Sequence, residues 1–162
     1  MGAGASVSKR LAGATPYSYR DDPDVPAFPD DKALLVFDGV CVLCSATARF
    51  VLERDGAARI RFATAQSPLG QALYRHYGLD TQAFETNLVL FEGRAHGKLD
   101  TVILGGRLLG GVWRAVGLLR LLPRPLGDWL YDRVARNRYR LFGRTEHCMM
   151  PRPEWQDRFI GL

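Results

Sequence analysis

Residues 34–56 read LLVFDGVCVLCSATARFVLERDG, two apolar segments with a turn and a pair of cysteines between them. The apolar run 33–37 has the length and composition of a buried strand, and Asp38-Gly39 ends it. From Ser45 to Arg54, apolar side chains recur at helical spacing among Arg and Glu, and a further Asp-Gly pair ends the segment. The stretch therefore predicts a strand that leads through a short turn into a helix.

Cys41 and Cys44 lie where this turn enters the helix. The chain has only three cysteines in 162 residues, so the pair does not belong to a dense disulfide framework. The first N–H groups of a helix lack backbone partners and, with the helix dipole, stabilise an anion such as a thiolate. We therefore expect Cys41 to be the nucleophile near the helix mouth. Cys44, one turn deeper, would be the resolving thiol of a redox pair.

The rest of the chain alternates between strand-like and helix-like segments. The pattern predicts an α/β domain with the element order β-α-β-α-β-β-α and a helical extension. The expected elements after the first helix are strands over 59–63, 87–91 and 95–99, and helices over 68–77, from Asp100 onward, and over 127–142.

The first 31 residues are rich in Pro, Gly, Ser and Asp and show little periodicity. This composition predicts a disordered or loosely draped tail over 1–31, followed by one domain over 32–162. The tail lacks the continuous apolar core of a secretory signal. Arginines interrupt the apolar stretches after residue 106 before any reaches the length of a membrane span. We therefore expect a cytoplasmic protein without a transmembrane segment.

Positive charge is concentrated in the last third of the chain. Eleven of the 22 Lys and Arg residues lie beyond residue 106, against five Asp and Glu, within a net charge of +5. No nucleic-acid-binding motif accompanies these arginines, so we expect no nucleic-acid partner. The interpretation we favour is a solvated helix face whose Arg stems lie on the core, although an acidic partner or an anionic membrane surface also fits.

A zinc site is the main alternative for the cysteine pair, with His147 and Cys148 completing four ligands. Adjacent residues seldom point at one ion, and no second knuckle with zinc-ligand spacing is present. We therefore expect no metal and treat Cys148 as structural. An inert, purely structural pair also remains open.

Two separated segments, FDGVCVLCSATARFVLERDG and LLPRPLGDWLYDRVARNRYRLFGRTEHCMMP, resemble the DCC family of predicted thiol-disulfide oxidoreductases. The resemblance covers about residues 34–151 and implies a thioredoxin-like fold. The family is named for an Asp and two Cys, which correspond to Asp38, Cys41 and Cys44. Its terminal signature corresponds to Arg138, Tyr139, Phe142, Gly143 and Cys148.

The resemblance implies an enzyme that exchanges disulfides at Cys41 and Cys44 with protein or small-molecule thiols, without a cofactor. For Asp38 two roles stay open: accepting the Cys44 proton, or bonding N–H groups of the turn. The segment AFETNLV lacks the proline that thioredoxin-like enzymes usually place beside the disulfide. The competing hypothesis is a non-catalytic interaction module that uses the basic C-terminal extension.

Overall fold

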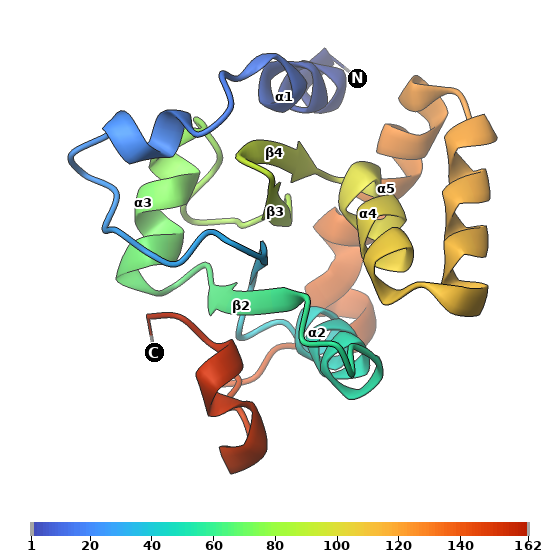
Figure 1. The fold of residues 1–162 in the computed structure, drawn as a ribbon. Coiled ribbons are helices and arrows are strands. Elements are labelled where there is room, and N and C mark those ends of the chain that lie inside the picture. The colour runs from blue at the N-terminus through green and yellow to red at the C-terminus, as the bar shows by residue number, and fades with distance from the viewer. Residues whose placement is uncertain (1, 162) are drawn as a thin grey trace.

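The computed structural model describes the backbone of residues 2–161 and the side chains of residues 7–161. At its centre is a four-stranded sheet in the order β2-β1-β3-β4 (Figure 1). Strand β1 pairs in parallel with β2 and antiparallel with β3, and β3 pairs antiparallel with β4. The strands are β1 (Ala33–Phe37), β2 (Ile60–Thr64), β3 (Leu88–Phe91) and β4 (Arg94–Gly97).

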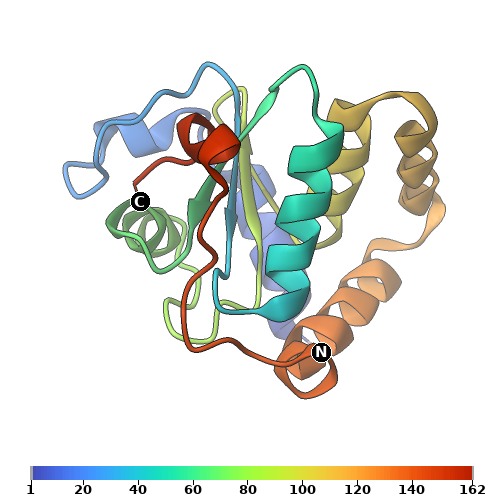
Figure 2. The same cartoon turned by 90° about the horizontal axis from the view of Figure 1, so that it is seen from below.

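Two helices connect strands of this sheet, a third follows its last strand, and together they cover both faces (Figure 2). They are α2 (Val42–Arg54), α3 (Pro68–His76) and α4 (Leu99–Leu109). Leu34 and Val36 of β1 face the core beside α3, whereas Phe37 faces the core beside α2, as the two-residue period of a strand requires. Figure 2 shows α2 and α3 on opposite sides of the sheet. The predicted order of elements is confirmed, and the fold is thioredoxin-like.

Helix α2 begins at Val42, three residues before the predicted start. The cause is the Cys41 side chain, which takes the N-cap position that Ser, Thr, Asp or Asn usually fills. Helix α3 begins as expected: the Ser67 hydroxyl accepts the Gly70 N–H at 3.1 Å, and Pro68 occupies the first turn.

The N-terminal segment differs from the loose tail that its composition predicts. It forms α1 (Gly2–Gly13) and the short 3-10 helix η1 (Ser18–Asp21), whereas Met1 lies outside the described residues. Leu11 is buried against Gly97, where a Cβ would lie 2.5 Å from the leucine methyl, and the Tyr17 ring packs on Gly93. The absence of two side chains on the β3–β4 hairpin thus gives this segment a surface on which to pack.

The C-terminal extension consists of the 3-10 helices η2 (Gly111–Leu121) and η3 (Pro153–Arg158), with α5 (Arg124–Phe142) between them. After α5 the chain crosses the start of α2 and returns to the sheet, where the Ile160 N–H donates to the Phe62 carbonyl at 2.8 Å. The Phe159 and Phe62 rings stack there, with their centroids 5.5 Å apart. Within the described residues, none of the helices has the length and apolar content needed to cross a membrane.

Candidate active site

The cysteine pair lies at the junction of β1 and α2, in the core cluster between the sheet and α2. The Cys44 N–H donates to the Cys41 sulfur at 3.2 Å, and both cysteines are free thiols. Both are buried, with 0% of Cys41 and 8% of Cys44 exposed. The expectation that Cys44 would lie deeper thus differs from the structure, in which Cys44 is the slightly more exposed of the two.

The environments of the two thiols differ in the direction that redox exchange requires. A hydrogen bond from the Cys44 side chain is the largest factor that lowers the pKa of Cys41, to about 6, and the Cys44 backbone N–H and the positive charge of Arg138 act in the same direction. The same side-chain hydrogen bond, together with burial, raises the pKa of Cys44 far above its ordinary value. The pair is therefore arranged as a thiolate at Cys41 beside a protonated thiol at Cys44.

Asp38 is fully buried and accepts four hydrogen bonds. The Val40 N–H donates to Oδ1 at 3.1 Å, and the Gln66 amide donates to the same oxygen at 2.6 Å. Arg138 donates to Oδ2 at 3.1 Å, and the Tyr139 hydroxyl also donates to Oδ2. Burial by itself would raise the pKa of Asp38, but these donors outweigh it and hold the pKa below its usual value. Asp38 is thus a carboxylate whose acceptor positions are largely filled.

Arg138 differs from the solvated arginine that its helix predicts. Its side chain is 4% exposed, and it donates to the carbonyl oxygens of Ala135 at 2.8 Å and Ala83 at 2.7 Å as well as to Asp38. Its Nε has no hydrogen-bond partner among the described residues. Because Arg138 lowers the pKa of both cysteines and Asp38 raises it, the ion pair also sets the charge that the sulfur atoms experience.

The segment that follows α5 covers Cys41. The backbones of Cys41 and Arg144 form an isolated antiparallel β-bridge. Beside it, the Val42 N–H donates to the Gly143 carbonyl at 3.4 Å, and the Thr145 N–H donates to the Val40 carbonyl at 2.8 Å. Further along, a Cβ placed on Gly39 would lie 3.4 Å from the Cys148 sulfur. The late cysteine therefore packs against the turn that carries the pair.

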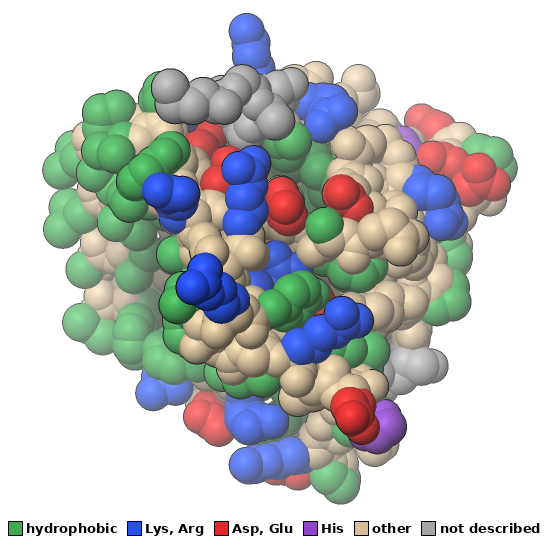
Figure 3. Space-filling view, turned by 180° about the vertical axis from the view of Figure 1, so that it is seen from behind, with side chains coloured by type: hydrophobic (Ala, Val, Ile, Leu, Met, Phe, Trp, Pro, Cys, Tyr) green, Lys and Arg blue, Asp and Glu red, His purple; other side chains and the backbone are tan. Residues whose placement is uncertain are grey.

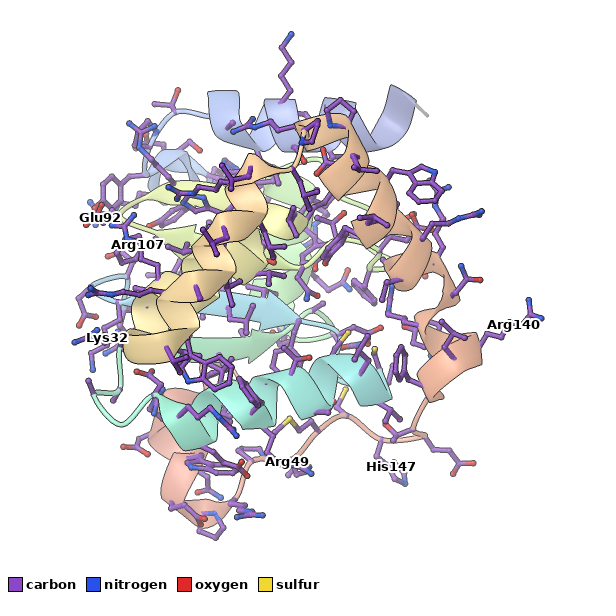
Figure 4. The ribbon with its side chains drawn as sticks, turned by 90° about the vertical axis from the view of Figure 1, so that its right-hand side faces the viewer. Lys32, Arg49, Glu92, Arg107, Arg140 and His147 are labelled. Carbon is purple, nitrogen blue, oxygen red and sulfur yellow. The ribbon has the colours of Figure 1, made fainter. Side chains whose placement is uncertain are left out.

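The proposed zinc ligands do not gather around the pair. Within the part of the chain that the structure describes, no three His, Cys, Asp or Glu side chains are arranged to hold a metal ion. His147 lies at the outer edge of the C-terminal segment and points away from the body of the molecule (Figure 4).

The sequence predicts Asp38, Cys41 and Cys44 as site residues, and the structure places all three at the turn between β1 and α2. The sequence does not predict the bonding of Asp38 to Gln66, Arg138 and Tyr139. A signal for Arg138 exists in the helical spacing, because it lies three residues after the buried Ala135 and therefore on the inward face of α5.

Comparison with known proteins places the chain in a family. Residues 35–144 match the family described as DCC1-like thiol-disulfide oxidoreductase. The chain belongs to this DCC family. It is 37% identical over 127 residues to the uncharacterized protein YuxK of Bacillus subtilis, covering 78% of this chain and 93% of that protein. It is also 30% identical over 120 residues to the chloroplastic DCC family protein At1g52590 of Arabidopsis thaliana, covering 74% of this chain and 70% of that protein. No solved structure matches the chain.

Proposed function

We propose that this DCC family protein is a thiol-disulfide oxidoreductase that uses Cys41 and Cys44 as its redox centre. The observation that carries the proposal is the asymmetry of the pair: the Cys41 sulfur accepts the Cys44 N–H at the start of α2, and its pKa is lowered to about 6, while that of Cys44 is raised. A thiolate and a thiol three residues apart are the reactants that dithiol exchange needs.

In the reducing direction, the Cys41 thiolate attacks one sulfur of a substrate disulfide. The substrate S–S bond breaks, a mixed disulfide with Cys41 forms, and the first substrate sulfur leaves as a thiolate. Cys44 then gives up its proton to the departing sulfur and attacks the Cys41 sulfur. The second substrate thiol is released, the protein pair is oxidised by two electrons and the substrate is reduced by two. An external thiol reverses these steps and returns the pair to the dithiol form.

Asp38 acts in this scheme as a positioning residue. A carboxylate with a lowered pKa that already accepts four hydrogen bonds is a poor acceptor for the Cys44 proton. Its bond to the Val40 N–H fixes the turn, and its bond to Arg138 holds a positive charge near the sulfur atoms. Of the two roles left open by the sequence, we therefore favour the structural bond to the turn.

A redox titration tests the proposal. The purified protein is equilibrated in glutathione buffers of increasing oxidising strength, free thiols are alkylated, and the labels are counted by mass. We expect two labels to be lost together in the wild type and in Cys148→Ser, because both keep the pair. In Cys41→Ser this paired loss of two labels should not occur. If both thiols of the pair remain free to react in strongly oxidising buffer, the proposed function is wrong.

The order of attack is tested separately with single-cysteine traps. Cys44→Ser should accumulate a mixed disulfide through Cys41, because its resolving thiol is absent, whereas Cys41→Ser should not. The reverse pattern would assign the attacking role to Cys44, the more exposed of the two.

The competing role as a non-catalytic interaction module makes a different demand on the extension. Arg136 and Arg140 are exposed on α5, and Arg140 points away from the molecule in Figure 4. Charge reversal at these two positions should leave exchange intact if the redox pair is the functional centre. Loss of exchange with an intact fold would favour the extension as the functional surface.

A further inference from the structure

An apolar groove begins at Cys44 and runs between α2, α4, η2 and α5. It consists of two hollows of about 340 and 220 Å³ that share Cys44, Thr47, Asn87 and Val102. Figure 4 looks onto this face, with η2 in front, α5 to its right and α2 running across below them. Cys44 is the member of the redox pair that lines both hollows, so a ligand in the groove lies beside the pair.

The walls of the groove are apolar and carry no unpaired charge among the described residues. Leu130 and Val134 of α5 form one wall, and Val102 of α4 forms another, and each is about half exposed. The charged residues that line the hollows are Glu85 and Arg138. Glu85 lies 3.7 Å from Arg136, and Arg138 is bound to Asp38. An anionic ligand such as glutathione therefore finds no free cation on these walls.

Asn87 supplies one polar handle where the two hollows meet. Its backbone N–H is not free to donate to a ligand, because it already donates to the Tyr131 hydroxyl at 3.1 Å. Its side-chain amide makes no hydrogen bond with any residue that the structure describes, although it lies half-buried in the groove beside Cys44. An amide both donates and accepts, and a peptide group offers the complementary acceptor and donor.

The apolar surface continues beyond the groove. Hydrophobic side chains gather along the left edge of Figure 3, over η2, where Val112, Leu118 and Leu121 are among the most exposed apolar residues of the molecule. Contiguous exposed apolar surface of this kind is typical of a binding face. A ligand longer than the groove thus has further apolar surface to contact.

We propose that the groove binds an extended polypeptide segment with apolar side chains on both sides of its cysteine, as the substrate of the redox pair. The inference rests on the proposed function. Two apolar hollows without an unpaired charge among the described residues accept the flanking side chains, and the Asn87 amide binds a peptide group between them. The substrate disulfide then lies on the Cys44 side of the redox pair, where the Cys41 thiolate attacks it. This chemistry favours a protein substrate over glutathione.

The test compares two disulfide substrates in three variants. The substrates are a peptide with leucines flanking a mixed-disulfide cysteine, and glutathione disulfide. Val134→Asp and Leu130→Glu place a charge on the apolar wall, and Leu141→Asp places one on an exposed part of α5 outside the groove. We expect both groove variants to lower kcat/KM for the peptide about tenfold or more, with glutathione disulfide changed less than about twofold. Leu141→Asp should change neither.

Several results would contradict the proposal that the groove binds the peptide substrate. One is an equal loss for Val134→Asp, Leu130→Glu and Leu141→Asp, and another is no loss in any of them while all keep the wild-type thermal transition. A third is a wild-type dimer in sedimentation that Val134→Asp converts to a monomer, because the groove would then hold a second copy of the chain. Because the two groove variants change separate, half-exposed positions, failure of one to fold leaves the other as the test.

A binding measurement separates failure of the groove from failure of the proposed function. The same leucine-rich peptide, with serine in place of its cysteine and a fluorescent label, is titrated with the wild type and Leu130→Glu. Binding that weakens about tenfold in the variant supports the groove even if neither disulfide is a substrate. Exchange of glutathione disulfide without any binding of this peptide would leave the redox function standing and overturn the groove.

Discussion

Arg138 and Asp38, a hundred residues apart in the chain, form a buried ion pair at 3.1 Å with 4% and 0% of their side chains exposed. The pair ties α5 to the turn that carries the cysteines. It also balances two effects on the sulfur atoms, since Arg138 lowers the pKa of Cys41 and Asp38 raises it. Removal of either partner should therefore affect both the fold and the chemistry.

Arg138→Met should lower the free energy of unfolding by about 3–5 kcal/mol, because it leaves the Asp38 carboxylate buried without its cation. The measurement is urea denaturation at neutral pH. Arg136→Met is the matched control: Arg136 is exposed and lies 3.7 Å from Glu85, so its loss should cost about 0–1 kcal/mol. Equal costs for the two variants would contradict a buried pair. Adding Asp38→Asn to Arg138→Met should recover part of the loss.

Asp38 should also make stability depend on pH. Its pKa is lower in the folded protein than in the unfolded chain, so the ionised group stabilises the fold fully above the unfolded value of about 4. This contribution is lost as the pH falls through the folded value. Urea denaturation at several acidic pH values should therefore show a smaller difference between wild type and Asp38→Asn as the pH decreases. A difference that grows toward low pH would contradict this assignment.

The Cys41 thiol should titrate with a midpoint near pH 6. An unperturbed thiol titrates at about pH 8.5. The ultraviolet absorbance of the thiolate, followed against pH in the reduced protein, measures this value. The transition should disappear in Cys41→Ser and move to higher pH in Cys44→Ala, which removes the side-chain hydrogen bond to the Cys41 sulfur. Cys148→Ser should leave it in place. If the transition near pH 6 disappears only in Cys148→Ser, the thiolate belongs to Cys148 and its assignment to Cys41 is wrong.

The core elements could be predicted because their signals are local. The run 33–37 and the spacing of apolar residues through Arg54 identify β1 and most of α2 without reference to the rest of the chain. Helix α1 has no such signal. Its burial depends on contacts such as that of Leu11 with Gly97, and a glycine far along the sequence is visible as a docking surface only in the folded structure.

The site divides in the same way. Asp38, Cys41 and Cys44 are neighbours in sequence, so their spacing alone brings them to one turn. Gln66 and Arg138 reach Asp38 from 28 and 100 residues away, and no local pattern reports that contact. A basic run in a helix usually indicates a solvated face, and the sequence around Arg138 therefore predicts an exposed side chain. Its position three residues after the buried Ala135 is the weaker signal that it faces inward.

Thr145→Val should speed the alkylation of Cys41 in the reduced protein. The one hydrogen of the Thr145 hydroxyl is shared between the carbonyl oxygens of His147, within the covering segment, and Val40, and the contact with Val40 helps to hold the segment over Cys41. Valine keeps the shape and removes the hydroxyl, so the segment should open more often. The measurement is the rate of labelling at Cys41, identified by mass, in a background that lacks Cys148.

Thr47→Val provides the control, because its hydroxyl donates only to the Leu43 carbonyl within α2. It should leave the labelling rate within about twofold of the wild type, whereas Thr145→Val should raise it several-fold, since a lost hydrogen bond of about 1 kcal/mol changes an opening equilibrium by about fivefold. Equal rates in the two variants would show that Thr145 does not control access to Cys41.

Gly39→Ala should destabilise the turn that carries the cysteines. A Cβ at this position would lie 2.9 Å from the Thr64 methyl carbon, so Thr64 or the turn must shift, whereas the Cys148 sulfur at 3.4 Å would be in close contact. We expect a loss of about 1–3 kcal/mol in urea denaturation, the usual cost of overpacking a buried site. Gly56→Ala is the control, since a Cβ there has no neighbour within 4 Å and should be tolerated. Thr64→Ser removes the closest methyl group, so Gly39→Ala should cost less in that background than in the wild type. An unchanged cost would place the strain elsewhere than at Thr64.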